Sequence, residues 1–144
     1  MNVEKRKEGE KEKGRRKEGR ERKEERKEKI RALIITHGHL DHIGGIPYLM
    51  ERMGNPPIYT REMTMVMIKK RQDEFPHQDP IDYNLVEPGD VRTLGSLKVR
   101  FFGVTHSIPD SMGVAIETPY GNIVLSGDLK LNHEKGEATD VEKT

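Results

Sequence analysis

The stretch that decides the fold is IRALIITHGHLDHIGGIPYL, at residues 30–49. Its first part, Ile30–Thr36, is a short run rich in branched apolar side chains, which predicts a buried β-strand. Histidines and an aspartate are concentrated directly after it, in His37–His42. From Ile46 onward apolar residues recur at helical spacing until Gly54, which favours the end of a helix. The stretch therefore predicts a strand, a loop and a helix, in that order.

The loop His37-Gly38-His39-Leu40-Asp41-His42 places three imidazoles and one carboxylate within six residues. His37 and His39 are two apart, so in an extended segment they project to the same side. A polar surface loop is the simple alternative, but four potential metal ligands within six positions favour a divalent metal site. The two isolated histidines, His77 and His133, lie in polar stretches and are expected to be surface residues.

Two later strand ends repeat this pattern. His106 follows a predicted strand that ends at Val104, and Asp128 follows one that ends at Ser126. Either residue alone would be an ordinary cap or turn residue. Because strand ends that lead into loops commonly carry functional side chains, we expect these two residues and the histidine loop to form one site.

The rest of the chain predicts a mixture of helices and strands. Pro47 suits a first helical turn, and Ile58-Tyr59 predicts a short strand. Thr60 is expected to cap a second helix, with a strand as the alternative. The side chains expected on one stripe of that helix are Met63, Val66, Met67 and Lys70. Residues 73–84 predict a loop, alternation at 97–101 predicts a strand, and 113–118 with 122–126 predict a hairpin around Pro-Tyr-Gly.

The 144-residue chain has a formal net charge of +1, but the charges are unevenly distributed, and the N-terminal segment, here called the leader, is highly charged. Residues 4–29 contain only Glu, Lys, Arg and Gly, with 14 basic and 9 acidic residues and a net charge of +5. Without apolar side chains the leader has nothing to bury, so we expect it to be disordered or transiently helical. Its charge also suits an arm that attracts RNA phosphate. Its composition, limited to residues with purine-only codons, also suits translation of a purine-rich tract.

Composition excludes several classes of protein. No apolar run reaches the roughly 18 residues of a membrane span, and no apolar segment near the N-terminus indicates secretion. The sequence contains no Cys, which excludes disulfides, thiolate catalysis and Cys-ligated metal centres. We therefore expect a cytoplasmic protein with no membrane association, in which His and carboxylate side chains hold any transition metal.

Three segments carry a resemblance to a known family: ITHGHLDHIGGIPYL at 35–49, PPIYT at 56–60, and VRFFGVTHSIPDSMGVAIETPYGNIVLSGDLK at 99–130. Through the H-x-H-x-D-H pattern the chain resembles the metallo-β-lactamase fold superfamily. The HSIPDS and SGDLK contexts make it similar, more narrowly, to the ribonuclease J family of the β-CASP branch. The resemblance implies an α/β fold, a partial αβ/βα sandwich, over residues 30–135.

The resemblance also implies a site with two Zn²⁺ ions, with manganese as an alternative metal. The implied ligands are His37, His39 and His106 for one ion, Asp41 and His42 for the second, and Asp128 as a bridge. The implied activity is hydrolysis of RNA, both 5′→3′ exonucleolytic and endonucleolytic, in which Asp41 orients the attacking water or accepts its proton. Ser107 and Ser111 are candidate phosphate contacts, with loop hydrogen bonding as the alternative. RNA is the implied partner, and the family implies homo-oligomers.

The chain departs from the family pattern on both sides of the matching region. The leader occupies the place of the family's first strands. No β-CASP domain or final ligand histidine follows Asp128, and His133 is too near Asp128 for that role. We therefore expect a fragment in three parts: a charged leader at 1–29, a partial metallo-β-lactamase-like domain at 30–135, and a polar tail at 136–144.

Three functions follow as hypotheses. The first is a zinc-dependent ribonuclease, weakly active or inactive as this chain alone. The second is a fragment that binds metal or RNA without catalysis. The third is another hydrolase of the same fold acting on a thioester or a lactone, which the HSIPDS context disfavours.

Overall fold

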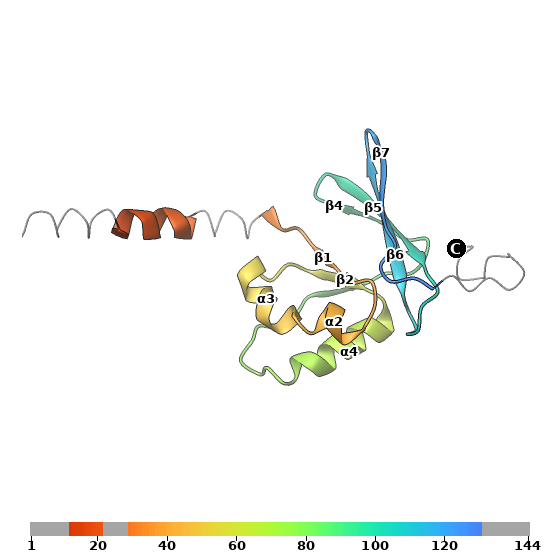
Figure 1. The fold of residues 1–144 in the computed structure, drawn as a ribbon, viewed down its shortest axis with the longest axis horizontal. Helices are drawn as coiled ribbons and strands as arrows, with labels where there is room; N and C mark the ends of the chain where they lie inside the picture. The colour runs from red at the N-terminus through yellow and green to blue at the C-terminus, as the bar shows by residue number, and fades with distance from the viewer. Residues whose placement is uncertain (1–11, 22–28, 131–144) are drawn as a thin grey trace, which may run out of the picture. The chain divides into compact units, whose positions relative to one another are not determined.

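The computed structural model describes residues 12–21 and 29–130 (Figure 1). It divides into two units, Met1–Ile30 and Arg31–Thr144. In the first unit residues 12–21 are helical, which was one of the two states expected for the leader. Two ion pairs between residues four apart, Arg16 with Glu12 and Lys17 with Glu21, lie along this helix. His133 and the tail at 136–144 lie outside the described residues.

The second unit begins with a parallel sheet, here called sheet A. It contains the strands β1 (Leu33–Ile34), β2 (Ile58–Thr60) and β3 (Tyr83–Leu85), in that spatial order. Parallel neighbours need a crossover connection. The helices α2 (Leu40–Ile43) and α3 (Ile46–Met53) lie between β1 and β2, and α4 (Glu62–Gln72) lies between β2 and β3.

The second half of the unit forms an antiparallel sheet, sheet B. Its strands are β4 (Val91–Leu94), β5 (Leu97–Gly103), β6 (Met112–Thr118) and β7 (Gly121–Leu125), with sequence neighbours paired throughout. The predicted hairpin is confirmed, since Thr118 lies opposite Gly121 across the β6–β7 turn. The strand predicted at 97–101 is also confirmed, and its alternation holds from Lys98 to Phe101, where Val99 and Phe101 are buried and Lys98 and Arg100 exposed. Leu97, which is 44% exposed, departs from the alternation.

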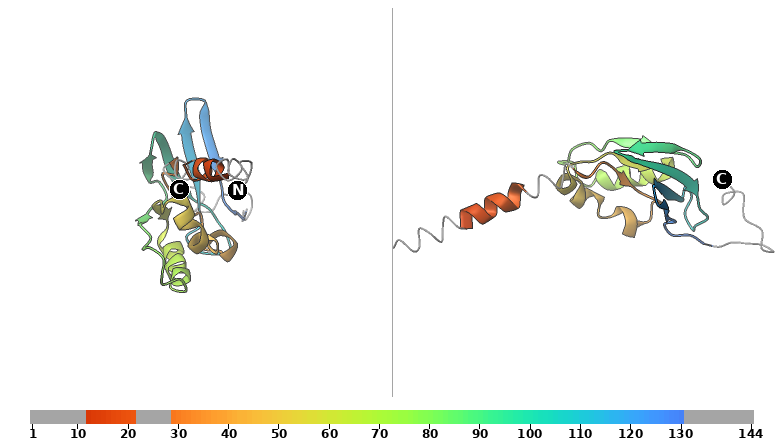
Figure 2. Two further views of the ribbon diagram at one scale, coloured as in Figure 1. Left: turned by 90° about the vertical axis from the view of Figure 1, so that its left-hand side faces the viewer. Right: turned by 90° about the horizontal axis from the view of Figure 1, so that it is seen from above.

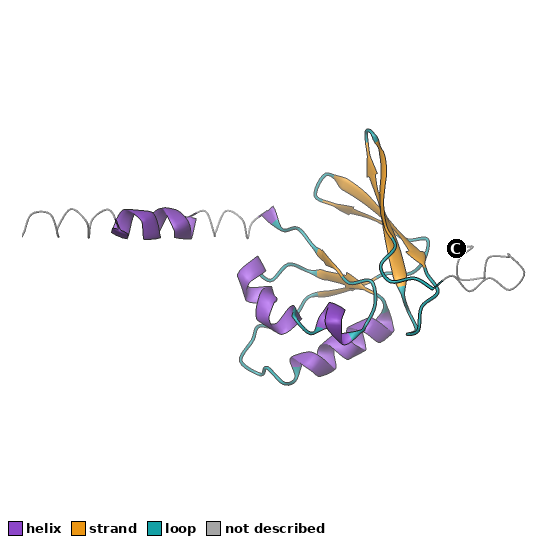
Figure 3. Ribbon diagram, in the orientation of Figure 1, coloured by secondary structure: helices purple, strands orange, loops and turns teal. Residues whose placement is uncertain are grey.

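The two sheets and the helices form layers, with the helices on the face of sheet A that points away from sheet B (Figures 1 and 3). The view from the side shows the same order, with the helices below and the strands of sheet B above (Figure 2, left). Alternate residues of a strand face opposite sides. Leu33 and Ile58 accordingly pack in a core beneath the helices. Ile34 and Tyr59 pack in a second core against sheet B. The expected α/β fold class is confirmed.

Helix α3 has the boundaries that the sequence indicates. Pro47 lies in its first turn, where a missing backbone N–H is tolerated. Gly54 ends it in the left-handed conformation, with φ 86°, and donates its backbone N–H to carbonyls of the last turn.

Two predictions for α4 are wrong. Thr60 does not cap this helix: Arg61 occupies the N-cap position, and the buried Thr60 hydroxyl donates to the Ile35 carbonyl. The predicted stripe is also misplaced, because the fully buried side chains are Thr64 and Ile68. Met63 and Val66, both assigned to the stripe, are 45% and 50% exposed.

A further difference concerns the histidine loop, whose second half is the short helix α2. Asp41 and His42 therefore lie on the helix Leu40–Ile43, whereas His39, at the N-cap, has an extended backbone conformation. None of the helices in the described residues combines the length and apolarity that crossing a bilayer would require.

Candidate metal centre

Three loops converge at the junction of the two sheets. Ile35 and Thr36, which follow β1, are hydrogen-bonded to both sheets. The Ile35 N–H donates to the Tyr59 carbonyl of sheet A, and the Met112 N–H of sheet B donates to the Thr36 carbonyl. The loop after β7 is tied to the loop after β5, because the Lys130 N–H donates to the Thr105 carbonyl over 2.7 Å. These backbone bonds bring the three strand ends to one place.

Four of the predicted ligands meet there. One ligand-type atom from each of His37, His39, His106 and Asp128 lies within 4.8 Å of the others. His106 Nε2 is 3.1 Å from His39 Nδ1 and 3.9 Å from Asp128 Oδ2. His37 Nε2 is 3.8 Å from the same carboxylate oxygen. Among the described residues this is the one group that could hold a metal ion.

His37 is at the centre of the cluster, and its side chain is completely buried. The ring centroids of His39, His42 and His106 lie 4.8, 4.1 and 4.8 Å from its own. Its Nδ1 is 3.0 Å from the Thr36 hydroxyl oxygen, whereas its buried Nε2 has no hydrogen-bond partner. Burial, followed by the neighbouring His42, His106 and His39, lowers the pKa of His37, and Asp128 only partly opposes this. The neutral ring, which can bind a metal, is therefore favoured.

The remaining two predicted ligands lie beside this group. His42 Nε2 is 3.4 Å from Asp128 Oδ2 and 3.5 Å from Asp41 Oδ2. Asp128 Oδ2 thus lies within 4 Å of a ring nitrogen of each of His37, His42 and His106. The Asp41 side chain is 78% exposed, so its carboxylate is open to solvent and to a ligand.

The donor set fits a transition metal. Two nitrogens bound to one tetrahedral zinc at about 2.0–2.1 Å lie roughly 3.3 Å apart. The 3.1 Å between His39 Nδ1 and His106 Nε2 is close to that spacing. A buried ring nitrogen without a partner, such as His37 Nε2, loses its interaction with water and regains one when it binds a cation.

Comparison with known proteins places this arrangement in a family. The family model described as "Metallo-beta-lactamase superfamily" matches residues 9–142. The chain belongs to the metallo-beta-lactamase superfamily. Ribonuclease J from Mycoplasma pneumoniae is 42% identical over 118 residues, which are 80% of this chain and 20% of that protein. The chain therefore spans about a fifth of the length of the curated relatives it matches.

Solved structures show the same fold. YhfI from Bacillus subtilis, a metallo-beta-lactamase fold protein, superposes with a TM-score of 0.55 at 21% identity, covering 71% of this chain and 42% of that one. Zn²⁺-bound PqqB from Methylobacterium extorquens gives a TM-score of 0.52 at 17% identity, covering 66% of this chain and 37% of that one. The described part of this chain is thus a partial metallo-beta-lactamase fold, and proteins named ribonuclease J are among its curated relatives.

Two glycines of this metallo-beta-lactamase domain allow the loops to approach closely. Gly127, with φ +61°, precedes Asp128, and a Cβ built there would lie 2.9 Å from the Thr36 Cβ. A Cβ at Gly38 would lie 2.5 Å from the Met67 sulfur of α4. Sequence reasoning missed the role of Thr36, whose only signal was its position directly before His37.

The two serines of the HSIPDS segment occupy different environments. Ser107 is exposed, and its hydroxyl oxygen lies 3.5 Å from His39 Nε2. Ser111 is 4% exposed, and its hydroxyl donates to the Ile108 carbonyl within its own turn. Ser107 is therefore the one of the two that a ligand at the cluster can reach.

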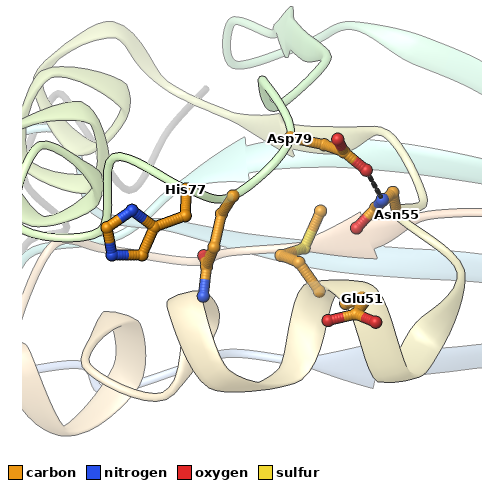
Figure 4. A pocket seen from close by; sticks show the side chains of 6 residues that line it. Glu51, Asn55, His77 and Asp79 are labelled. Carbon is orange, nitrogen blue, oxygen red and sulfur yellow. Dashed lines mark hydrogen bonds between the residues drawn. The ribbon is translucent and has the colours of Figure 1, made fainter.

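His77 lies in a different part of the domain. It lines a pocket of about 330 Å³ together with Met50, Glu51, Asn55, Gln78 and Asp79. His77 lies at one end of this pocket and the two carboxylates at the other, where Asn55 donates to Asp79 (Figure 4). Among the described residues, the group that could hold a metal ion is the histidine cluster and does not include these side chains.

Proposed function

We propose that this chain supplies the metal-binding part of a zinc-dependent ribonuclease of the ribonuclease J type, which hydrolyses phosphodiester bonds in RNA. The observation that carries the proposal is the convergence of His37, His39, His106 and Asp128 from three separate loops. The curated relatives named ribonuclease J support RNA as the substrate.

The proposed ligand assignment uses two groups of side chains that share Asp128. His37, His39 and His106 would hold one ion, with the unpartnered His37 Nε2 as the strongest support. Asp41 and His42 would hold the second, because His42 Nε2 lies 3.4 Å from Asp128 Oδ2 and 3.5 Å from Asp41 Oδ2. Imidazole and carboxylate ligands suit zinc, and they also suit manganese. The Zn²⁺-bound neighbour of the same fold favours zinc.

In this proposal each side chain of the site has a separate chemical role. Bound zinc would lower the pKa of a water and neutralise charge on the phosphodiester. Asp41, with its exposed carboxylate, orients the attacking water and accepts its proton. Ser107 is placed to donate its hydroxyl to a phosphate oxygen. Ser111 already donates within its turn, so we assign the substrate contact to Ser107 alone.

The test is to measure metal content and RNA cleavage on the full chain. We expect up to two zinc ions per chain by elemental analysis, and cleavage of end-labelled RNA that a chelator abolishes. A double variant, His37→Ala with His39→Ala, should lose both metal and cleavage, because it removes two converging ligands. His77→Ala is the matched control and should retain both, since His77 lies in the separate pocket.

The outcomes distinguish the candidate functions. Zinc uptake without cleavage would favour binding without catalysis, which is consistent with a chain that spans a fifth of its relatives' length. Hydrolysis of a thioester or lactone in preference to RNA would favour another hydrolase of this fold. Metal content unchanged in the double variant would refute the ligand assignment.

A further inference from the structure

The N-terminus of α4 is capped by a residue from far along the chain. The N-cap residue, Arg61, makes no side-chain cap of its own, which leaves first-turn N–H groups in need of acceptors. The Met63 N–H donates to Asp110 Oδ2 over 2.9 Å, across a sequence separation of 47 residues. Asp110 belongs to the segment 104–111, here called the His106 loop.

A second contact fixes the same carboxylate. Arg61 Nη2 lies 3.2 Å from Asp110 Oδ1 and 2.9 Å from Glu87 Oε2, and the Arg61 side chain is only 19% exposed. Asp110 also adopts a left-handed backbone conformation, with φ 60°. Residues other than glycine seldom adopt it, and it persists where the surrounding contacts determine it. The carboxylate contacts thus hold an otherwise unfavourable bend of the His106 loop.

Helix α4 contacts the other ligand-bearing loop as well. One turn after Met63, the Met67 side chain packs against Gly38, between His37 and His39, with no room for a Cβ. One helix therefore contacts both the loop that carries His37 and His39 and the loop that carries His106.

We propose that Asp110 is a positioning residue for the metal centre: by capping α4 and pairing with Arg61, it holds His106 at the distance from His39 at which one ion can bind both. This inference rests on the proposed metal site. It concerns a residue that contacts none of the ligand side chains through a described hydrogen bond or ion pair.

The first experiment needs no metal. Hydrogen exchange of the metal-free full chain should show faster exchange in 104–111 and at the start of α4 in Asp110→Ala than in the parent chain. Asp110→Asn should restore most of the protection, because its side-chain oxygen still accepts from Met63 N–H and Asn tolerates a positive φ. Unchanged exchange in 104–111 would overturn the proposal, whether or not the chain binds metal.

The second experiment uses Co²⁺ as the probe. Asp110→Ala should bind Co²⁺ about tenfold more weakly, the lower end of the range for partners that orient ligands. Its absorption spectrum when loaded should change in the direction seen for His106→Ala. Loss of stability alone would leave the spectrum of the loaded chain unaltered, so an unaltered spectrum contradicts the positioning role.

Two controls separate the causes. Asp79→Ala removes a surface contact of the same 2.9 Å length from the pocket beside α3, and should leave Co²⁺ binding unchanged. Glu87→Gln releases Arg61 on its other side and should have a smaller effect than Asp110→Ala. If Asp110→Ala does not fold, Co²⁺ binding is compared between the parent chain and the variants Asp110→Asn and Arg61→Met instead. Failure of the parent chain to bind Co²⁺ would count against the proposed function, while the exchange experiment still tests Asp110.

Discussion

At the scale of single residues, His37 couples the metal site to the stability of the domain. Its imidazole is buried beside three others, and its pKa is lowered below the ordinary value of 6.5. At a pH above that value the ring is neutral in both the folded and the unfolded chain, so His37 adds no pH dependence to the free energy of unfolding. Below it the unfolded chain takes up a proton that the folded chain does not.

We therefore predict that the metal-free chain loses stability as the pH falls from about 6.5 towards 5, by at most about 1.4 kcal/mol per pH unit for this one proton. Urea unfolding across that range measures the slope. His37→Gln should flatten it, whereas His77→Gln should leave it as it is. An equal slope in His37→Gln would show that other groups carry the pH dependence.

Much of the site was predictable because the ligands are close together in the sequence or follow strands. The pattern from His37 to His42 identified most of the candidates, and His106 and Asp128 followed from strand ends. Asp110 was a candidate to support a ligand histidine or to cap its own turn, but the contacts of the supporting residues were not predictable. Asp110 acts on Met63, and Gly127 packs against Thr36, across separations that no local pattern encodes.

At the scale of elements, the predictions succeeded where local chemistry determines the structure. Pro47 and Gly54 set the ends of α3, and the β6–β7 hairpin follows from its turn. The buried face of α4 was not predictable, since apolar side chains from Met63 to Ile68 surround the helix almost completely. Packing against Gly38 and the sheet, rather than apolarity, determines which side is buried.

The turn before Asp128 provides an element-scale prediction. Gly127→Ala should destabilise the chain by roughly 1–2 kcal/mol, because it forces a left-handed conformation on alanine. It should also weaken zinc binding, because the new Cβ displaces Thr36 and the Asp128 loop together. Urea unfolding and competition with a zinc chelator measure the two effects.

Gly89→Ala is the matched control. Gly89 also has a positive φ, of 92°, but its Cβ would meet nothing within 4 Å. The Gly89→Ala variant should therefore have a lower free energy of unfolding but the same affinity for zinc. Equal losses of affinity in the two variants would mean that the contact with Thr36 does not support the site.

At the scale of the whole molecule, the metal ligands come from the two ends of the described domain. His37 follows sheet A and Asp128 follows sheet B, so an ion held by both would cross-link two layers with separate cores. An unfolded chain does not hold these ligands together. Binding free energy then adds directly to folding free energy.

Zinc should accordingly raise the thermal unfolding midpoint of the chain. At a free zinc concentration about 100 times its Kd, the free energy of unfolding rises by about 2.7 kcal/mol. That corresponds to a rise in the unfolding midpoint of roughly 10–20 °C for a domain of about 100 residues. Thermal unfolding followed by circular dichroism, with and without zinc, measures it, and excess chelator should reverse it. A midpoint that zinc does not move would argue against a site that joins the two sheets.

The outer strand of sheet B exposes apolar side chains at a sheet edge. β7 lies at the edge of the sheet, and Ile123, Val124 and Leu125 are 56%, 60% and 51% exposed, on both of its faces. Such an edge favours pairing with strands of other molecules. A formal net charge of +1 provides little repulsion against it. We therefore expect charged substitutions on β7, such as Val124→Lys, to raise the solubility of the purified chain.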